Sequence, residues 1–223
     1  KLIRTASKGK SDAVRTRVAI IGAGFGGLGM AHYLKQAGFE DLTIFEKKGA
    51  LGGVWRDNTY PGAACDVPSH LYSFSFETGY PWSHRFARQP EILAYQQHCA
   101  ERHDLLRHIR FGHELTAARF DPARAIWTLS FAGGDTLEAD IVVSAVGQLH
   151  RPSIPDIPGA EGFAGLRFHS AQWPASLDLS GKRVAVVGTG ASAVQFVPEI
   201  APQVDTLHVF QRSPGWVLPM EWV

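Results

Sequence analysis

The sequence lacks the features of a disulfide-rich or nucleic-acid-binding protein. Its only cysteines among 223 residues are Cys65 and Cys99. Two cysteines give no disulfide framework, so a reducing cytoplasm is the expected location, and the lack of a C-x-x-C motif disfavours a disulfide reductase. The 22 basic and 21 acidic residues give a net charge of +1. Such a balance predicts no nucleic-acid partner and no anionic membrane surface.

Long hydrophobic runs are also absent. The most apolar stretch, residues 18–34, is interrupted by glycines and contains His32, so we interpret it as strand, turn and helix rather than a membrane span. Residues 1–16 are basic and polar without the apolar centre of a signal peptide, and we expect a flexible leader there. With 45% apolar and 19% charged residues, the composition is that of a globular protein with a sizeable core.

Residues 17–150 are predicted to form one domain. A strand at Arg17–Ile21, a helix over about Gly26–Ala37 and a strand at Leu42–Glu46 make a βαβ unit. A second helix is predicted from Pro90 to about Arg107, with a buried stripe of Ile92, Tyr95, Cys99 and Leu106. His98, His103 and His108 should point in different directions around it, which argues against a metal site. Three β-prone runs, Leu115–Phe120, Ile126–Phe131 and Thr136–Ser144, predict an antiparallel meander.

A proline-rich linker, residues 151–180, leads to a second unit at residues 181–223. A strand at Arg183–Val187, a helix over Ser192–Ile200 and a strand at Thr206–Phe210 repeat the βαβ pattern. A doubly wound domain needs more strands, so we expect this unit to be truncated. The predicted fold class is therefore α/β, with two Rossmann-like dinucleotide-binding units and a small meander.

The first unit carries a dinucleotide-binding signature. Gly22, Gly24 and Gly27 match G-x-G-x-x-G, in which the glycines make the turn, admit a pyrophosphate and let the helix pack on the strand. Glu46 ends the next strand nineteen residues after Gly27, near the expected spacing of a ribose-binding carboxylate. This acid would repel a 2′-phosphate, so the ligand should be NAD or FAD. The alternative is a glycine-rich turn followed by an exposed glutamate.

The segment Leu51–Asp66 decides between NAD and FAD. It is rich in glycine and aromatic residues and follows the acid-bearing strand directly. A simple dehydrogenase has no need of such a loop, whereas the bulky ring system of a flavin must be covered. We therefore predict FAD in the first unit.

The second unit carries a related motif with the opposite charge. Gly188, Gly190 and Ala193 match G-x-G-x-x-A, and Arg212 follows Ala193 by nineteen residues, where the first unit has its acid. A guanidinium offers paired donors to a phosphate, which predicts NADPH rather than NADH. Taken alone, Arg212 is also compatible with an ordinary surface arginine. Together the two units indicate a flavoprotein that is reduced by NADPH.

Two segments resemble the Baeyer–Villiger monooxygenases, a group of class B flavoprotein monooxygenases. The first, Gly52–Asp66, has the residues of the family's loop after the FAD ribose acid, namely Trp55, Tyr60, Pro61, Gly62 and Asp66. The second, "FAGLRFHSAQWP", matches the fingerprint F-x-G-x-x-x-H-x-x-x-W-P through Phe163, Gly165, His169, Trp173 and Pro174. The resemblance extends over essentially the whole chain from Val18.

The resemblance implies a reaction and its partners. NADPH would reduce FAD, O₂ would add to give a flavin peroxide, and a small-molecule ketone would become an ester or lactone. Asp66 would orient the family's active-site arginine, for which we identify no counterpart in these residues. The implied catalytic residues are Asp66 and His169. We expect His169 to act as a hinge or supporting residue rather than as the catalytic base. An Asx-type loop cap is the alternative for Asp66, and Cys65 could be a redox thiol but is better explained by packing.

The resemblance also implies the binding residues. Those for FAD, with the glycine loop, are Gly22, Gly24, Phe25, Gly27, Glu46, Val54, Trp55, Asp66 and Tyr72. Those for NADPH are Gly188, Thr189, Gly190, Ala191, Ser192, Gln195, Arg212 and Ser213, with Ala64, Cys65 and Asp66 at the nicotinamide end. Two other functions stay open: an N- or S-oxygenating flavin monooxygenase, and a non-catalytic nucleotide-binding fragment.

Overall fold

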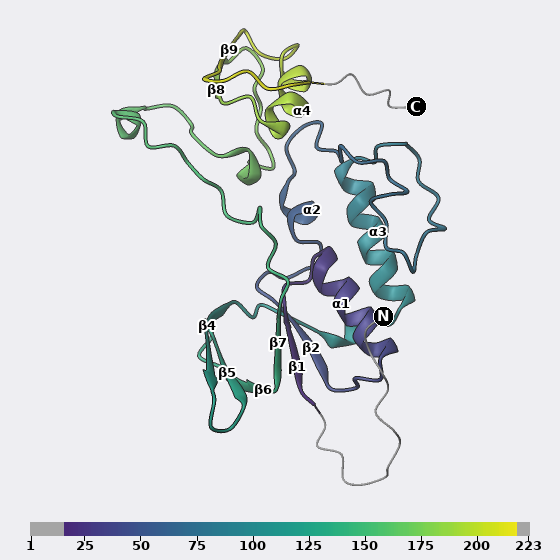
Figure 1. Cartoon of the computed structure of the whole chain (residues 1–223). Helices are drawn as coiled ribbons and strands as arrows, with labels where there is room; N and C mark the ends of the chain where they lie inside the picture. The colour runs from purple at the N-terminus through teal and green to yellow at the C-terminus, as the bar shows by residue number, and fades with distance from the viewer. Residues whose placement is uncertain (1–15, 218–223) are drawn as a thin grey trace.

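A four-stranded parallel sheet is the framework of the first unit. In the computed structural model, which describes residues 16–217, the strands are β1 (Val18–Ile21), β2 (Leu42–Glu46), β3 (Ile109–Phe111) and β7 (Ile141–Ser144). Their order is β3-β2-β1-β7, so β1 is central and pairs with β2 and β7 (Figure 1). β1 is short and wholly apolar, as expected of a parallel strand that is covered on both faces.

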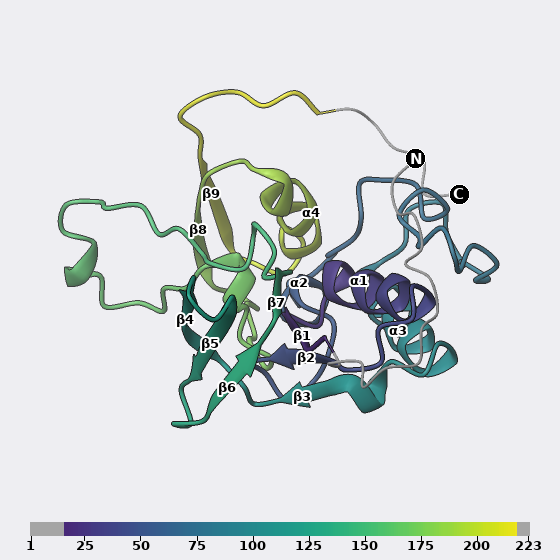
Figure 2. The same ribbon diagram turned by 60° about the horizontal axis from the view of Figure 1, so that its bottom comes forward.

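The two faces of this sheet are covered by different structures. Val18 and Ile20 of β1 pack toward α1 (Phe25–Gln36) and the end of α3 (Gln89–Arg102). Ala19 and Ile21, which alternate with them, pack toward an antiparallel meander of β4 (Leu115–Asp121), β5 (Ile126–Phe131) and β6 (Thr136–Ala139). Figure 2 shows the helices and the meander on opposite sides of the sheet. The sheet therefore lies at the centre of the core, and the predicted meander is confirmed.

Two sequence-based predictions about this unit were wrong, and one strand was missed. α3 ends at Arg102 rather than near Arg107, because the chain turns through Asp104 at φ +53° while Lys35 of α1 donates hydrogen bonds to the carbonyls of His103 and Asp104. Leu105 is consequently buried and Leu106 exposed. The run Thr136–Ser144 is two strands, since β6 stays in the meander and β7 joins the parallel sheet. Strand β3 was not predicted.

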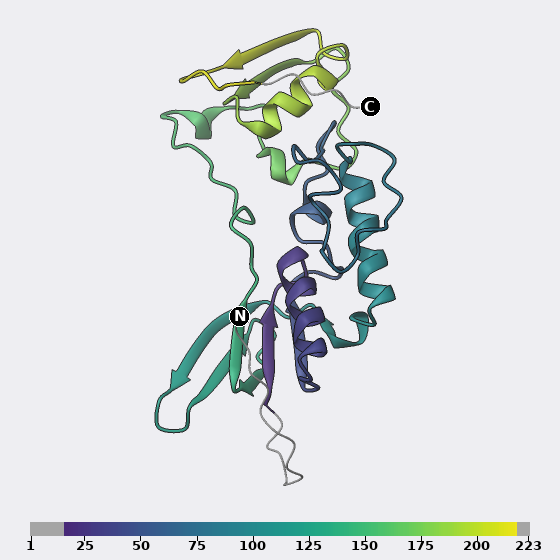
Figure 3. The same ribbon diagram turned by 45° about the vertical axis from the view of Figure 1, so that its right-hand side comes forward.

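The second unit is a βαβ unit, as predicted. β8 (Arg183–Val187) pairs in parallel with β9 (Thr206–Phe210), and α4 (Ala191–Ile200) connects them. Between β7 and β8 the chain contains only two short 3₁₀ helices, η2 (Ala160–Gly162) and η3 (Ser170–Gln172). Figure 3 shows α4 facing the loops at the far end of α3, so the second unit approaches the first through that helix.

The predicted α/β fold class is confirmed by these two units. Among residues 16–217, no helix is long and apolar enough to cross a membrane.

Candidate dinucleotide-binding site

The first glycine loop is sterically closed around its glycines. Gly22 has φ +107°, and a Cβ there would lie 2.6 Å from the carbonyl oxygen of Ala145. A Cβ on Gly27 would overlap with the carbonyl oxygen of Gly22, so α1 can approach β1 only because this residue is glycine. Gly24 precedes α1 as its N-cap and offers no side-chain acceptor to the first N–H groups of the helix. The loop therefore presents free backbone donors at a helix N-terminus, which suits a pyrophosphate.

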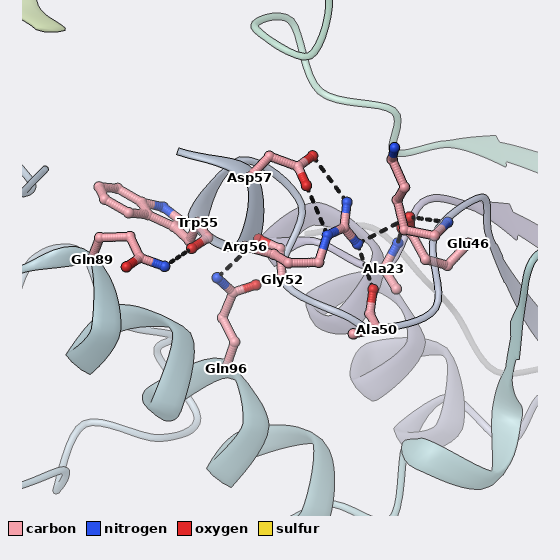
Figure 4. A network of polar contacts seen from close by, with 10 residues as sticks. Ala23, Glu46, Ala50, Gly52, Trp55, Arg56, Asp57, Gln89 and Gln96 are labelled. Atoms are coloured by element: carbon pink, nitrogen blue, oxygen red, sulfur yellow. Dashed lines mark hydrogen bonds and ion pairs between the residues drawn. The ribbon is translucent and has the colours of Figure 1, made fainter. Parts of the chain in front are cut away.

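Glu46 lies at the end of β2 and is held in place by three donors (Figure 4). It is only 5% exposed, which rules out the alternative of an exposed glutamate. Oε2 accepts from the backbone N–H of Ala23 at 2.9 Å, and Oε1 accepts from Lys48 N–H at 3.0 Å and Arg56 Nη1 at 3.2 Å. The carboxylate is thus fixed beside the glycine loop, where a ribose would lie.

Arg56 is a site residue that the sequence alone did not identify. Its guanidinium also contacts Asp57, at 2.8 and 3.0 Å, and the carbonyl of Ala50. Burial works against its charge, but Asp57 and Glu46 more than offset this and raise the pKa of Arg56. The one feature of the sequence that could have identified Arg56 is its position as a basic residue in the segment Leu51–Asp66, which is rich in glycine and aromatic residues. Arg56 ties that segment to the predicted ribose acid.

The aromatic residues assigned to FAD meet beside the glycine loop. The Phe25 and Tyr72 rings lie 4.9 Å apart, and Trp55 Nε1 donates to the Tyr72 hydroxyl at 3.0 Å. Burial raises the pKa of Tyr72. Trp55 follows Val54 in the short helix α2 (Val54–Asp57), whose N-cap Gly53 approaches Gly24 so closely that a Cβ would lie 3.3 Å from its Cα. Residues distant in sequence therefore form one apolar wall next to the loop.

Cys65 and Asp66 have contrasting surroundings. The Cys65 side chain is 4% exposed, packs with Ala87 and Ile92, and burial raises its pKa, so packing explains it better than redox chemistry. Asp66 is exposed, and within residues 16–217 its carboxylate forms no hydrogen bond. The N–H of Val67 instead donates to Cys65 Sγ at 3.4 Å, so the Asx-type cap gains no support.

The second glycine loop is open where the first is closed. Gly188 has φ +99°, and a Cβ on either Gly188 or Gly190 would meet no atom within 4 Å. Gly190 is the N-cap of α4 and gives it no side-chain acceptor. Arg212 and Ser213 are exposed after β9, and Gln211 donates from Nε2 to Thr189 Oγ1 at 3.0 Å. A shallow cavity of about 300 Å³ lies beside the loop, lined in part by Thr189, Ala193, Val194 and Gln211.

Gln195 lies away from this loop. Its amide contacts the backbone of Ala64 and the hydroxyl of Tyr60 in the first unit. The remaining NADPH residues, Ala191 and Ser192, form the first turn of α4 next to Gly190. The predicted set is therefore divided between the loop end of α4 and the face that contacts the first unit.

The fingerprint segment packs against the same helix. The Trp173 ring lies 5.3 Å from that of Phe196 in α4 and 5.2 Å from that of Phe168. Nδ1 of His169 accepts from the N–H of Ala171 at 3.1 Å and begins η3, a local structural role. Phe163 is 63% exposed, and its ring occupies the position that a Cβ on Gly165 would take. The aromatic residues of the fingerprint segment thus pack partly on α4 and partly on one another or on the segment's own backbone.

The expectation that the histidines near α3 point apart was wrong for two of them. His103 Nε2 lies 2.9 Å and His98 Nε2 3.5 Å from the carboxylate of Glu77, because α3 ends before His103. Arg102 Nε joins them at 3.0 Å, and the pKa of Glu77 is lowered: burial opposes this, but these partners outweigh it. Among the described residues, no group of three or more potential ligands could hold a metal ion.

A family profile described as "FMO-like: Flavin-binding monooxygenase-like" matches residues 15–222 of the sequence. The chain belongs to this family. A Baeyer-Villiger monooxygenase of Streptomyces coelicolor is 52% identical over 203 residues, which cover 91% of this chain and 39% of that protein. Phenazine N-monooxygenase PhzNO1 of Lysobacter antibioticus is 38% identical over 213 residues, covering 94% and 39%.

Solved structures agree with these relatives. Cyclohexanone monooxygenase from Rhodococcus sp. Phi1 bound to NADP+ superposes with a TM-score of 0.85 at 40% identity, over 91% of this chain and 39% of that one. A crystal structure of OTEMO in complex with FAD and NADP gives a TM-score of 0.84 at 36% identity, over 93% and 40%. The resemblance to the Baeyer–Villiger monooxygenases is confirmed. The chain spans about two fifths of the length of the relatives it matches.

Proposed function

We propose that this chain forms the FAD- and NADPH-binding part of a monooxygenase that uses O₂ to convert a ketone to an ester or lactone. The observation that carries the proposal is the opposite charge at equivalent places in the two units. Buried Glu46 follows the first glycine loop, whereas exposed Arg212 follows the second. The first arrangement suits a ribose and the second a 2′-phosphate. We propose residues 17–150 and 181–223 as the two binding domains, joined by 151–180.

The residues of the first unit fit FAD. The N-terminus of α1 would hold the pyrophosphate, Glu46 would accept from the ribose hydroxyls, and Phe25, Trp55 and Tyr72 would cover the ring system. Gly24 and Gly53 leave the space for close backbone approach. When bound, the flavin supplies the redox chemistry with O₂. The protein contributes binding, orientation and exclusion of water.

In the second unit, the N-terminus of α4 and Arg212 would hold NADPH. Thr189 is already ordered by Gln211. The exposed side chain of Asp66 would orient a cationic side chain near the flavin. His169 would support the segment between the units. Two free, buried cysteines are consistent with a reducing cytoplasm, which we propose as the location.

The relative named phenazine N-monooxygenase favours a second candidate, N-oxygenation. Product analysis separates the two. The FAD-loaded chain would be incubated with NADPH, O₂ and either cyclohexanone or a phenazine. A lactone supports the first proposal, and an N-oxide supports the second. An FAD-loaded chain that forms neither product and does not consume NADPH would reduce this chain to a non-catalytic nucleotide-binding fragment.

A further inference from the structure

The backbone of Ala64 lies in a short extended segment with one paired edge. Residues 63–65 pair with residues 87–89, since Cys65 N–H donates to the carbonyl of Ala87 at 3.0 Å and Gln89 N–H to that of Ala63 at 2.8 Å. In an extended chain the polar groups of alternate residues point to opposite edges. The N–H and carbonyl of Ala64 therefore face away from residues 87–89, although Ala64 itself is buried and these groups need partners.

The side-chain amide of Gln195 supplies both partners. Ala64 N–H donates to Oε1 at 3.3 Å, and Nε2 donates to the Ala64 carbonyl at 2.9 Å. A carboxamide has the same donor and acceptor as a peptide group, so it takes the place of a neighbouring strand. The Tyr60 hydroxyl also donates to Oε1, at 2.9 Å. Through these contacts α4 of the second unit is joined to a loop 131 residues earlier in the sequence.

The surrounding contacts show that α4 is packed closely here. A Cβ on Gly62 would lie 2.9 Å from the carbonyl oxygen of Gln195 and 2.8 Å from Cγ of Glu199, so glycine permits the approach. Tyr60, Ala63, Phe196 and Ile200 share one buried apolar cluster. The Gln195 hydrogen bonds thus form beside a packed apolar cluster, where a lost partner is costly.

We propose that Gln195 is a positioning residue that fixes residues 63–65, and with them Asp66, relative to the helix that begins at the second glycine loop. The role rests on the proposed function, because Asp66 and that loop would serve the two cofactors. Gln195 lies five residues after Gly190, and Asp66 lies two residues after Ala64. A displacement of α4 would therefore move the segment that carries Asp66. The amide acts on the loop backbone rather than on NADPH.

Hydrogen exchange tests the link without any cofactor. Gln195→Met keeps the length of the side chain but removes all three hydrogen bonds. The Ala64 amide should then exchange about tenfold faster, which corresponds to about 1.4 kcal/mol, while amides in β1 keep their rates. Gln203→Met is the matched control, since Gln203 Nε2 donates only to Glu199 in its own helix region. Unchanged exchange at Ala64 in Gln195→Met would overturn the proposal.

A second measurement tests the positioning role. In FAD-loaded protein, Gln195→Met should slow anaerobic flavin reduction by NADPH about tenfold, with FAD content and reduction by dithionite unchanged. Tyr60→Phe removes one of the three hydrogen bonds and should slow flavin reduction less. It replaces Gln195→Met as the test variant if Gln195→Met does not fold. A wild-type NADPH rate in a variant with a loosened Ala64 would refute the role. A wild-type chain that binds no FAD would instead contradict the proposed function and leave the exchange result standing.

Discussion

The two glycine-rich units share a βαβ motif but differ in how their loops are enclosed. In the first, the loop is pressed between β1, α1 and β7, and its acid is buried with three donors. In the second, the glycines have no neighbours within reach of an added Cβ, and Arg212 is exposed. In the first unit, the carboxylate proposed to bind the ribose is already fixed by its donors. In the second unit, the arginine proposed to bind the 2′-phosphate is exposed to solvent.

The largest expected effect tests the closed packing of the first loop. Gly27→Ala places a methyl group against the Gly22 carbonyl and should lower the free energy of unfolding by at least about 2 kcal/mol. Gly26→Ala is the matched control, because its Cβ would lie an ordinary 3.6 Å from Ala145. Urea unfolding of both variants measures the difference. Equal stabilities would show that the loop is not as tightly closed as its geometry indicates.

The buried acid should matter more for FAD than any other single side chain. Glu46→Gln removes the charge that accepts from Ala23, Lys48 and Arg56. FAD affinity should fall about 10- to 100-fold, the usual value of hydrogen bonds to a charged group, with NADPH affinity unchanged. Titration of flavin-free protein measures both. An equal loss for the exposed control Glu161→Gln would remove the special role of Glu46.

Asp66 should affect the reaction rather than binding. Because its side chain is exposed, Asp66→Ala should change the free energy of unfolding by less than about 0.5 kcal/mol. Oxygenation should nevertheless fall about tenfold, less than for a group that itself transfers a proton, while FAD content stays constant. Product formation and flavin absorbance are measured on the same samples. Parallel loss of both would assign Asp66 to structure.

The open loop should determine cofactor choice through one exposed residue. Arg212→Ala should weaken NADPH binding about tenfold and leave NADH binding unchanged, which erases the preference between them. Arg151→Ala, in the linker, is the control for general loss of positive charge. An unchanged ratio of the two dissociation constants would make Arg212 an ordinary surface residue.

The smallest effect is expected at the cysteines. Burial raises the pKa of Cys65, and that of Cys99 to about 11, so neither thiol is ionised near neutral pH. Alkylation of the folded chain should be negligible at pH 7 and should increase as the pH rises. Rapid labelling of Cys65 at pH 7 would revive a redox role and would show that the closed unit opens readily.

Apolar runs and motif spacing predicted the strands and helices whose formation depends on residues close together in the sequence. The apolar runs that end at Gly22 and Gly188 are strands, and the spacing to Glu46 identified a residue that is indeed buried beside the loop. The features that could not be predicted from the sequence depend on contacts between distant residues. α3 ends early at a turn whose carbonyls, those of His103 and Asp104, are bound by Lys35 of another helix. No periodicity could show that.

The same reason explains two site residues whose contacts could not be predicted from the sequence. Arg56 reaches Glu46 through the folding of a loop without helical or strand period, so its partner is not readable from spacing. Gln195 was assigned to NADPH by resemblance, yet its amide meets Ala64, which is 131 residues away. Residue type and motif located the two glycine loops, and tertiary packing decided which side chains join them.

We propose that one chain holds FAD in the first unit and takes electrons from NADPH bound at the second. The most direct measurement is anaerobic addition of NADPH to the FAD-loaded chain while the flavin absorbance is followed. The account predicts that NADPH bleaches the flavin at a lower concentration than NADH does, and that Arg212→Ala removes this difference. A flavin that stays oxidised although both cofactors are bound would contradict the account.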